Sequence, residues 1–541
     1  MKNILLPLLT MLLTVFSAEA QLVIDNATFF IGENAVVTVQ GDLTTNVNIQ
    51  AGGAAATQGK IQMKGSSLQT IAAGGNLIPR LEIDNASHVQ LTQDLRVENR
   101  IDLLNGRLRT FNNNLILPAT ITVVGMNASR FIETNGTGAV RQLVPANVAS
   151  LRMVPIGNGA NYTPIEFTST GATYAAGAFI AFRATGIAVP TPARHPRTES
   201  FLTNSWEVTK SGVAGGTQNV EGTYTNVQIT GTEADIRGMF WNGTIWSRTG
   251  GGQNAANNMV ATSVPGTTGT LYGMNTFVLV SPKVFLQGAY NTVTGLMNDG
   301  LRLGGNVIPV ADPYRVAPYS TQFTHVNNAT GETVPAALFN DNANPDNNIV
   351  DWVFVELRNI TNSTTAPVDQ TRSVLVQRDG DLVDVDGVSP VYFKNVEAVA
   401  TYAISIRHRN HIGLSTNPAV AVSLGLANTN INLTALPTGS LFGTANTNYV
   451  RTGGNVNLLY GGNGNFNAST RFSGIANDRD YMLGTVLLGN QAQILNTIYS
   501  QGDLNMNKNV RYAGINNDKD FLLSQPLGGN QAIIKSQSLP N

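Results

Sequence analysis

The sequence predicts an all-β protein of several domains, and three observations support this. Apolar side chains recur in short runs that alternate with polar residues, which is typical of β-strands. The runs are separated by Asn and by many of the 54 Gly residues, which tolerate the positive φ of tight turns. No stretch keeps the apolar period of a long helix. The chain has 541 residues, far more than the roughly 100–200 of a typical domain, so we expect three or four domains.

Residues 1–20 have the pattern of a secretory signal peptide. Lys2 supplies the positive start, Ile4 to Phe16 is almost wholly apolar, and Ala18-Glu19-Ala20 is a small-x-small cleavage site. We therefore expect a mature chain that begins near Gln21 and is exported, either extracellular or on the outer cell surface. No later segment reaches the roughly 20 consecutive apolar residues of a membrane-spanning helix, so no transmembrane segment is predicted in the mature chain.

Composition narrows the classes of partner. Charged residues make up 12% of the chain and the net charge is -1. This balance, with no basic stripe, argues against nucleic acid as a partner. It leaves little charge repulsion between copies, which suits a protein that is anchored or assembled. Cysteine is absent, so stability must come from core burial, sheet ladders or bound ions rather than disulfides.

Residues 21–139 are predicted to form a parallel β-helix-like domain. Their apolar runs are very short, and Ile24-Asp25-Asn26-Ala27-Thr28 returns as Ile83-Asp84-Asn85-Ala86-Ser87, a sign of internal repetition. Short strands suit the rungs of a β-helix, where stacked coils complete the core. An ordinary β-sandwich with the same alternation is the alternative. The predicted strands are Leu22–Ile24, Val36–Val39, Val47–Ile49, Lys60–Met63, Leu81–Ile83, Val89–Leu91, Leu95–Val97, Ile101–Leu103, Leu108–Thr110 and Leu115–Leu117.

Residues 140–282 have longer strands and are predicted to form a β-sandwich. Met239 to Trp246 reads as a hairpin with Asn242-Gly243 as its two-residue turn, because Asn-Gly favours that turn. Trp241 and Trp246 would then face each other across the hairpin. We interpret them as packing partners rather than as a sugar-stacking pair.

Residues 283–424 form a further predicted β module with two polar clusters. Four aspartates crowd the segment from Asp379 to Asp386, and an Asp379-Gly380 hairpin turn explains them better than a glycosidase carboxylate pair. His408 and His411 are the only clustered histidines. With no cysteine and five histidines in the chain, a zinc site is hard to complete. A strand that ends in a polar loop is the preferred interpretation.

Residues 425–541 contain a duplication, the sharpest pattern in the chain. Gly462–Leu495 aligns with Gly502–Lys535 at a constant offset of 40 residues, and 16 of the 34 paired positions are identical. Both copies place side-chain oxygens at alternate positions, followed by Gly and an Asn-Asp-x-Asp cluster. Oxygen ligands at such spacing suit a hard cation, so the repeats 462–495 and 502–535 are predicted to bind calcium. The predicted ligands are Asp503, Asn505, Asn507, Asn509, Asp518 and Asp520 in the second copy, and Asn463, Asn465, Asn467, Asp478 and Asp480 in the first.

Both copies depart from an EF-hand loop. Lys508 and Ala468 stand at position 6, where Gly is expected, and Gly514 and Gly474 stand at position 12, where an acid is expected. The first copy offers amides where the second has Asp503, so it should bind calcium more weakly.

The later acids, Asp518 and Asp520, allow two interpretations. A longer loop returns them to the ion, or Asn517-Asp518 caps a short helix through Phe521–Leu523. Both can hold together.

The last 260 residues or so also resemble a known class of proteins. This part of the chain is similar to a module of large exported, hemagglutinin-like or adhesin-like surface proteins of Bacteroidetes bacteria. In those proteins the module is often followed by dockerin-like, calcium-associated repeats. The resemblance implies no reaction. It rests on Val284–Tyr290, Met297–Arg302, Ile308-Pro309, Asp312–Tyr314, Ile349–Arg358, Gln377–Asp384 and Ile406–Gly413.

These observations favour a secreted structural or adhesive surface protein over an enzyme. No His-Glu-x-x-His, Gly-x-Ser-x-Gly or phosphate-cradling motif is present in the sequence. The expected partners are other surface proteins or extracellular glycans. The alternatives are a β-helix protein that binds or degrades polysaccharide and a self-assembling subunit of an extracellular fibre.

Overall fold

The computed structural model describes residues 20–144, 153–186, 197–248, 252–360, 365–396, 401–420, 422–424 and 427–540. Strands hold 44% of the residues, so the prediction of a β-rich fold is confirmed. Residues 1–19 of the expected signal peptide lie outside the described ranges. None of the helices within these ranges combines the length and the apolar character needed to cross a membrane.

The chain divides into two compact units. The first unit contains Met1–Arg194 and Glu199–Asn275, and the second contains His195–Thr198 and Thr276–Asn541. A domain boundary was predicted nearby, before Lys283.

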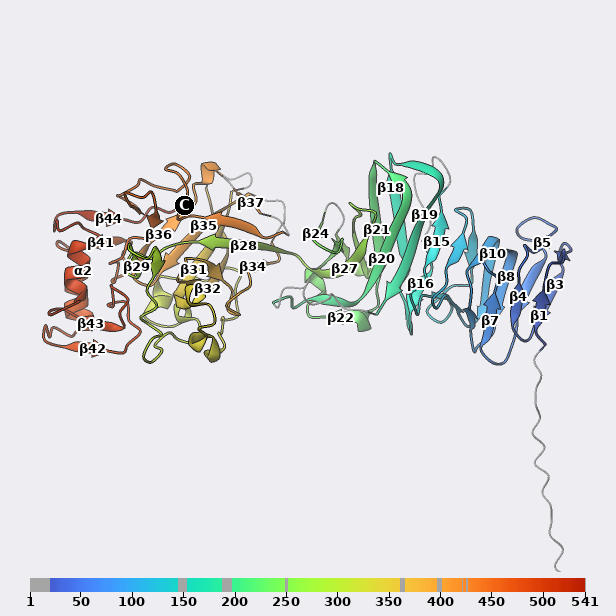
Figure 1. The fold of residues 1–541 in the computed structure, drawn as a ribbon, viewed down its shortest axis with the longest axis horizontal. Helices are drawn as coiled ribbons and strands as arrows, with labels where there is room; N and C mark the ends of the chain where they lie inside the picture. Colours follow the sequence, from blue (N-terminus) through green and yellow to red (C-terminus); the bar gives the residue numbers. More distant parts are fainter. Residues whose placement is uncertain are drawn as a thin grey trace, which may run out of the picture. The chain divides into compact units, whose positions relative to one another are not determined.

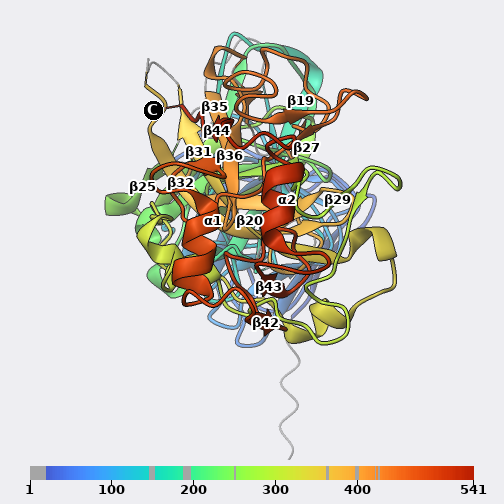
Figure 2. The ribbon, with the colours of Figure 1, turned by 90° about the vertical axis from the view of Figure 1, so that its left-hand side faces the viewer.

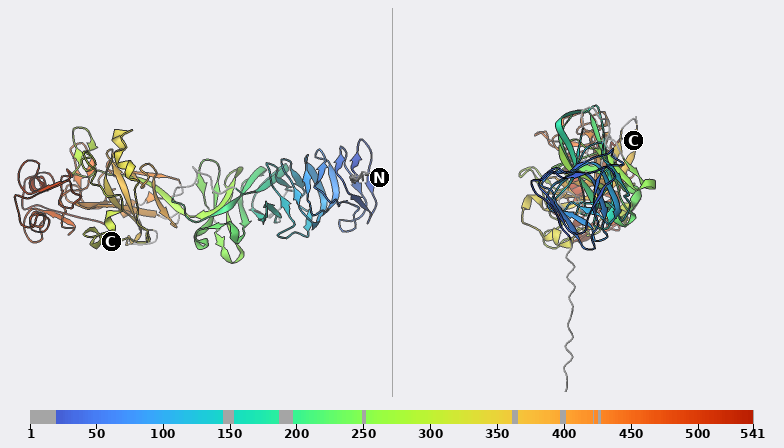
Figure 3. Two further views of the ribbon diagram at one scale, coloured as in Figure 1. Left: turned by 90° about the horizontal axis from the view of Figure 1, so that it is seen from below. Right: turned by 90° about the vertical axis from the view of Figure 1, so that its right-hand side faces the viewer.

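The first unit begins with a β-solenoid of about six turns, whose rungs are visible in Figures 1 and 3. Its strands stack in parallel ladders, and each ladder joins strands from successive coils. The first ladder runs through β1 (Leu22–Ile24), β4 (Leu43–Thr45), β7 (Gln69–Ala72), β9 (Val89–Leu91), β11 (Leu108–Arg109) and β14 (Ile132–Glu133). The second runs through β3 (Val36–Val39), β6 (Lys60–Met63), β8 (Leu77–Asp84), β10 (Leu95–Asn105), β12 (Leu115–Leu117) and β15 (Val140–Leu143). A short third ladder pairs β2 (Phe30–Ile31) with β5 (Gln50–Ala51).

Stacking of inward side chains explains why three-residue strands are stable here. Leu43 pairs with Ile71, and Ile71 pairs with Leu91 in the next strand of the ladder; all three are fully buried. Each coil therefore completes the core of its neighbours. The parallel pairing confirms the β-helix-like prediction and excludes the sandwich alternative for this segment. The predicted strand Val47–Ile49 is wrong, because the strands in that coil are β4 and β5.

Two buried amide side chains, Asn85 and Gln69, form a hydrogen-bonded ladder inside the solenoid. Asn85, 1% exposed, donates from Nδ2 to Ser67 O (2.7 Å) and to Oε1 of Gln69 (2.9 Å). Its Oδ1 accepts the N–H of Ser87 (2.8 Å). Gln69 in turn donates to Val39 O (3.0 Å), so the amides connect neighbouring coils.

We expect Asn85→Ala to lower the unfolding free energy of the first unit by about 1–3 kcal/mol, because buried hydrogen-bonding groups lose their partner. The measurement is urea unfolding of the full chain with hydrogen-exchange mass spectrometry, which follows each unit separately. Gln90→Ala, on the half-exposed face of β9, is the matched control and should change stability by less than about 0.5 kcal/mol. Equal losses in the two variants would contradict a structural role for the ladder.

The second ladder continues into antiparallel strands without a break. β15 pairs with β19 (Thr173–Thr185), followed by β20 (Phe201–Ala214), β27 (Thr268–Asn275) and β23 (Ile236–Trp241). A separate antiparallel sheet contains β18 (Ile165–Thr170), β21 (Thr217–Thr223), β26 (Met259–Ser263) and β25 (Gln253–Asn254). Their buried side chains belong to the same hydrophobic core as the solenoid. Residues 21–139 and the part of 140–282 up to Asn275, predicted to belong to separate domains, therefore share one core, whereas Val278 and Val280 belong to the core of the second unit.

The predicted tryptophan hairpin is present, but its turn differs from the prediction. β23 pairs antiparallel with β24 (Trp246–Ser247), and Trp241 lies opposite Trp246. The ring centroids are 5.0 Å apart, which confirms that the pair packs across the hairpin. The predicted two-residue turn is wrong: the connection spans residues 242–245, and Oδ1 of Asn242 accepts the N–H of Thr244 and of Ile245.

Within the described residues, the two largest sheets of the second unit have six and three strands. The larger contains β33 (Leu382–Val383), β32 (Val368–Gln377), β31 (Ile349–Asn359), β35 (Thr401–His408), β36 (His411–Ser415) and β37 (Val422–Ser423). The smaller contains β34 (Val391–Lys394), β28 (Phe277–Lys283) and β38 (Thr429–Asn432). The predicted Asp379-Gly380 hairpin is confirmed, since β32 pairs antiparallel with β33 and Gly380 has φ 95°.

The two repeat copies at the C-terminal end exchange strands. The first copy contains β41 (Ser469–Arg471), α1 (Asp478–Tyr481) and β42 (Ile494–Asn496), and the second contains β43 (Asn509–Arg511), α2 (Asp518–Ser524) and β44 (Ile534–Ser536). β41 pairs with β44, and β42 pairs with β43. Each copy thus completes its sheet with a strand of the other. Figure 2 shows both helices.

Candidate functional site

The second repeat brings two predicted ligands, Asp503 and Asp518, into a buried loop. Both residues are fully buried. Asp503 accepts the N–H of Asn507 (2.9 Å) at Oδ1 and of Lys508 (2.8 Å) at Oδ2. Asp518 accepts the N–H of Leu504 (2.7 Å) at Oδ1 and of Arg511 at Oδ2 (2.9 Å). The backbone of the loop therefore surrounds the two carboxylates and donates its N–H groups to them.

The first repeat repeats this arrangement with one change. Asp478, 1% exposed, accepts the N–H of Arg471 (2.9 Å), as Asp518 does from Arg511. Asn463 stands where the second copy has Asp503. It is 6% exposed, and its Oδ1 has no hydrogen-bond partner within the described ranges. Oδ1 of Asn505, also buried, lacks one too. Orphaned buried oxygens of this kind are costly unless a ligand satisfies them.

The buried carboxyls of both loops hold their protons more tightly than free aspartate. Burial raises the pKa of Asp478 to about 8, although backbone N–H groups partly oppose it. Burial likewise raises the pKa of Asp503 to about 6, against the opposing effect of the Arg409 charge. The pKa of Asp518 lies well above its ordinary value, through burial and through repulsion from Asp503.

The remaining predicted ligands are engaged within the chain. Nδ2 groups of Asn465 and Asn467 donate to Ala476 O, and those of Asn505 and Asn507 donate to Asn516 O. Asn509 bonds to Asn507.

Asp480 and Asp520 are exposed, unlike Asp478 and Asp518, and Asp480 lines a surface pocket together with Asn465 and Asn467 of the first loop. Their side chains are 58% and 66% exposed. Each accepts from the Nδ2 of an N-cap residue, Asn477 or Asn517, whose Oδ1 accepts the aspartate's own N–H. This is the capping interpretation of these acids.

The loops fit a hard cation in their donor set. Asp503, Asp518 and Oδ1 of Asn505 offer the oxygen ligands that calcium prefers, and each carboxylate oxygen retains a further lone pair. Within the part of the chain that the structure describes, no three His, Cys, Asp or Glu side chains form a metal-binding group. Six of the eleven predicted ligands are asparagines, which are not among these residue types.

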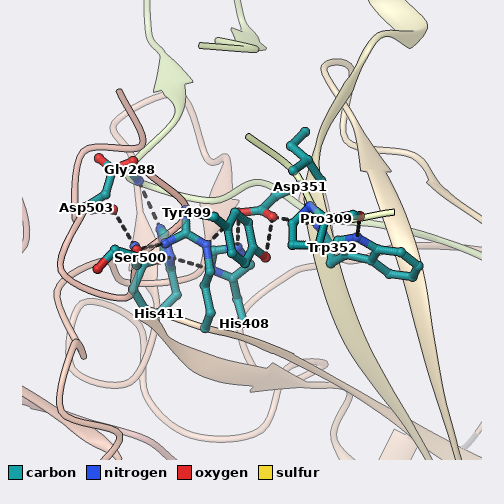
Figure 4. A network of polar contacts seen from close by, with 12 residues as sticks. Gly288, Pro309, Asp351, Trp352, His408, His411, Tyr499, Ser500 and Asp503 are labelled. Carbon is teal, nitrogen blue, oxygen red and sulfur yellow. Dashed lines mark hydrogen bonds and ion pairs between the residues drawn. The ribbon is translucent and has the colours of Figure 1, made fainter. Parts of the chain in front are cut away.

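A buried polar network lies directly beside the second loop (Figure 4). Asp351 of β31 accepts from His408 Nε2 (3.0 Å) and Arg409 Nε (2.9 Å) at Oδ2. At Oδ1 it accepts from the hydroxyl of Tyr499 and the N–H of Trp352, both at 2.8 Å. The side chains of Asp351, His408 and Arg409 are all 0% exposed.

Hydrogen bonds fix the tautomers of the two histidines. The N–H of Gly288 donates to Nε2 of His411 (3.0 Å), so Nδ1 of His411 carries the proton. That proton faces Nδ1 of His408 (3.0 Å) and Oδ1 of Asn410 (2.7 Å). His408 then donates from Nε2 to Asp351. Both rings are satisfied in the neutral form.

The charges of the network agree with this assignment. Burial would raise the pKa of Asp351, but Arg409 and the bond from His408 outweigh it and lower the pKa. Burial lowers the pKa of His411 well below its ordinary value, helped by repulsion from His408 and Arg409. The network therefore contains one ion pair, Asp351 with Arg409, and two neutral imidazoles.

The network joins the β module to both repeats. Arg409 donates from Nη1 to Ser500 O, and its guanidinium lies 4.5 Å from the centroid of the Tyr499 ring. Asn410 donates from Nδ2 to Asp503 O (2.6 Å), and its own carbonyl accepts the N–H of Gly462 and of Asn463. Asn410 thus contacts the start of the loop in each copy.

Sequence reasoning missed this network. The clustered histidines were interpreted as a strand that ends in a polar loop, whereas β35 and β36 form a hairpin in which residues 408–411 are all buried. Asp351 was the available signal. It interrupts the apolar run Ile349–Val355, and a charge inside a fully buried strand requires a buried partner.

Comparison of the chain with models of protein families, with curated proteins and with solved structures gave no match.

Proposed function

We propose that the chain is an exported cell-surface protein with a structural or adhesive role, whose C-terminal repeats are stabilised by calcium. The observation that carries the proposal is the sealed network around Asp351. Its Asp, two His and Arg are residue types used in catalysis, yet the side chains of Asp351, His408 and Arg409 are 0% exposed. A group that reacts with substrate must reach it. The bonds of this network instead run to Ser500 and Asp503, which supports the role of a clamp.

The signal-peptide pattern and the resemblance to hemagglutinin-like or adhesin-like surface proteins of Bacteroidetes support export. Other surface proteins and extracellular glycans are the proposed partners. Protease treatment of intact cells tests the location: the protein should be degraded in intact cells, and its survival there would contradict surface exposure. Electron microscopy of the purified protein tests the fibre alternative.

A polysaccharide-degrading enzyme is the competing function. The mature full chain is incubated with a panel of glycans, and reducing ends are measured over time. We expect no release of reducing ends. Release that increases with protein concentration would contradict the structural or adhesive proposal.

The calcium proposal rests on Asp503, Asp518 and the orphaned Oδ1 atoms of Asn463 and Asn505. Bound calcium would offset the repulsion between the carboxylates and tie each loop to its helix. Asp503 and Asp518 would hold it in the second copy, Asp478 and Asn463 in the first. Because the first copy supplies less negative charge, it should bind more weakly.

We expect calcium to raise the thermal stability of the second unit more at pH 8 than at pH 6. The pKa values of Asp478 and Asp503, about 8 and about 6, exceed the ordinary value of 3.8. Without metal, the stability that their protonated forms contribute is therefore lost as the pH rises from about 4 to about 8. Calcium binds the deprotonated form. A saturating excess of about 100 Kd corresponds to about 2.7 kcal/mol of stabilisation.

The measurement is differential scanning calorimetry of the full chain in calcium chloride and in EGTA. Asp503→Asn combined with Asp518→Asn should abolish the response of the second copy. Asp520→Asn is the matched control, since that carboxylate is exposed and accepts from the N-cap residue Asn517, and it should retain the response. Identical transitions in calcium and in EGTA at both pH values would refute the metal proposal.

A further inference from the structure

A polar pocket of about 430 Å³ opens on the second unit, and none of its lining residues belongs to the repeats. β28 and β38 form one wall. They pair in parallel, with Ser281 opposite Asn430 and Lys283 opposite Asn432. Because side chains alternate along a strand, these four lie on one face, while Ile431 turns into the core. The turn 387–390 and the start of β33 form the other wall. The volume of the pocket lies in the range of roughly 300–1,000 Å³ that is typical of small-ligand sites.

The amide groups of this wall are fixed in orientation, and their donors are free. Oδ1 of Asn432 accepts the N–H (3.1 Å) and the hydroxyl (2.6 Å) of Thr434. Oδ1 of Asn430 accepts from Nδ2 of Asn428 (3.2 Å). Among the described residues, neither Asn430 nor Asn432 donates from Nδ2 to a protein atom. Two amide donors on a shared face are therefore available to a ligand.

The charges of the pocket are paired internally. Nζ of Lys283 lies 3.2 Å from Oδ2 of Asp379 and 3.0 Å from Oδ1 of Asp381. The two carboxylates outweigh the single ammonium by one negative charge, which disfavours an anionic ligand. Asp381, 49% exposed at its side chain, presents its second oxygen as an acceptor. Donors and acceptors thus occur together, and the two charged groups that line the pocket itself, Lys283 and Asp381, balance each other.

An apolar residue completes the site. Val388 lines the pocket and is 76% exposed, so it can pack against an apolar ligand face. A sugar ring combines such a face of C–H groups with hydroxyls that both donate and accept. We propose that this pocket binds a neutral carbohydrate, with Asn430 and Asn432 donating to its hydroxyls, Asp381 accepting from one, and Val388 contacting the ring. This inference rests on the proposed adhesive function, for which it supplies the glycan-binding site.

The test is isothermal titration calorimetry of the full chain with neutral and charged oligosaccharides. The neutral probes are cellohexaose, mannohexaose, xylohexaose and maltohexaose; the charged probes are an oligogalacturonate and a chitosan oligomer. We expect at least one neutral probe to bind. Asn430→Ala and Asp381→Asn should each weaken that binding by roughly tenfold, the effect of one lost hydrogen bond. Gln525→Ala, an exposed amide elsewhere in the second unit, should leave the affinity unchanged.

Calorimetric unfolding of each variant shows whether its fold is retained, and Asn430→Asp provides a second variant at the same position. It removes the Nδ2 donor without shortening the side chain, and should weaken binding as Asn430→Ala does. Unchanged affinity in folded Asn430→Ala and Asp381→Asn would overturn the pocket assignment, and so would binding of charged probes alone. Failure of every probe to bind would also overturn it, while the surface location and lack of turnover proposed above would be judged separately by their own assays.

Discussion

Asp351→Ala is expected to lower the unfolding free energy of the second unit by about 3–5 kcal/mol. Removal of the carboxylate leaves the fully buried Arg409 without its counter-ion, and breaking one partner of a buried pair carries a cost of this size. It also removes the acceptor of His408 and of the Tyr499 hydroxyl. Because Arg409 reaches Ser500 and Asn410 reaches Asp503, hydrogen exchange should increase in residues 499–510 as well as in β31 and β35.

The control for Asp351→Ala is Asp346→Asn, at an exposed aspartate of the same unit, which should change stability by less than about 0.5 kcal/mol. The double variant Asp351→Ala with Arg409→Met removes both charges. It should be more stable than Asp351→Ala alone, since a buried pair can be replaced by apolar groups at little cost. A loss near 1 kcal/mol in Asp351→Ala, without faster exchange in residues 499–510, would show that the network does not clamp the repeats.

Trp206→Ala is expected to lower the unfolding free energy of the first unit by about 3–5 kcal/mol. Trp206 of β20 is fully buried, and its Nε1 donates to Thr163 O (2.9 Å). A Cβ placed at Gly222 of β21 would lie 2.7 Å from the Trp206 ring, so the indole fills the space that this glycine leaves. Its loss creates a cavity and leaves a buried carbonyl without its donor.

The matched control for Trp206→Ala is Trp241→Ala in the half-exposed hairpin. Its ring packs against Trp246, so the expected loss is about 0.5–1.5 kcal/mol. Urea unfolding with hydrogen exchange resolved along the chain measures both variants. The interpretation fails if Trp241→Ala destabilises the first unit as much as Trp206→Ala does.

Local sequence patterns were sufficient to predict an element where its backbone conformation depends only on neighbouring residues. The triplets from Leu22–Ile24 to Leu115–Leu117 predicted most solenoid strands, because inward and outward side chains alternate with period two whatever the strand pairs with. The prediction of a strand at Val47–Ile49 was wrong because a run of three apolar or amide residues can form a bend as well as a solenoid strand. The Asp379-Gly380 turn succeeded because Gly380 meets a φ of 95° that other residues rarely adopt.

Contacts between segments that are far apart in the sequence could not be predicted from the sequence. Asp351, Arg409 and Tyr499 are separated by more than fifty residues from one to the next, and no spacing rule relates them. The pocket formed by β28 and β38 has the same origin, since Lys283 and Asn432 meet only through a parallel pairing. In the repeats, spacing alone did not separate Asp518, whose carboxylate accepts backbone N–H groups of the loop, from Asp520, whose carboxylate bonds to the N-cap residue Asn517.

By itself the sequence determined the strand-rich class, the solenoid and the duplication at the C-terminal end. Each follows from local periodicity or from identity between two segments, which require no knowledge of what lies nearby in space. The tertiary structure alone decided that the solenoid shares its core with the antiparallel strands, that the repeats exchange strands, and that a sealed ion pair ties them to the β module. The physical reason is that burial and charge pairing depend on side chains from distant parts of the chain.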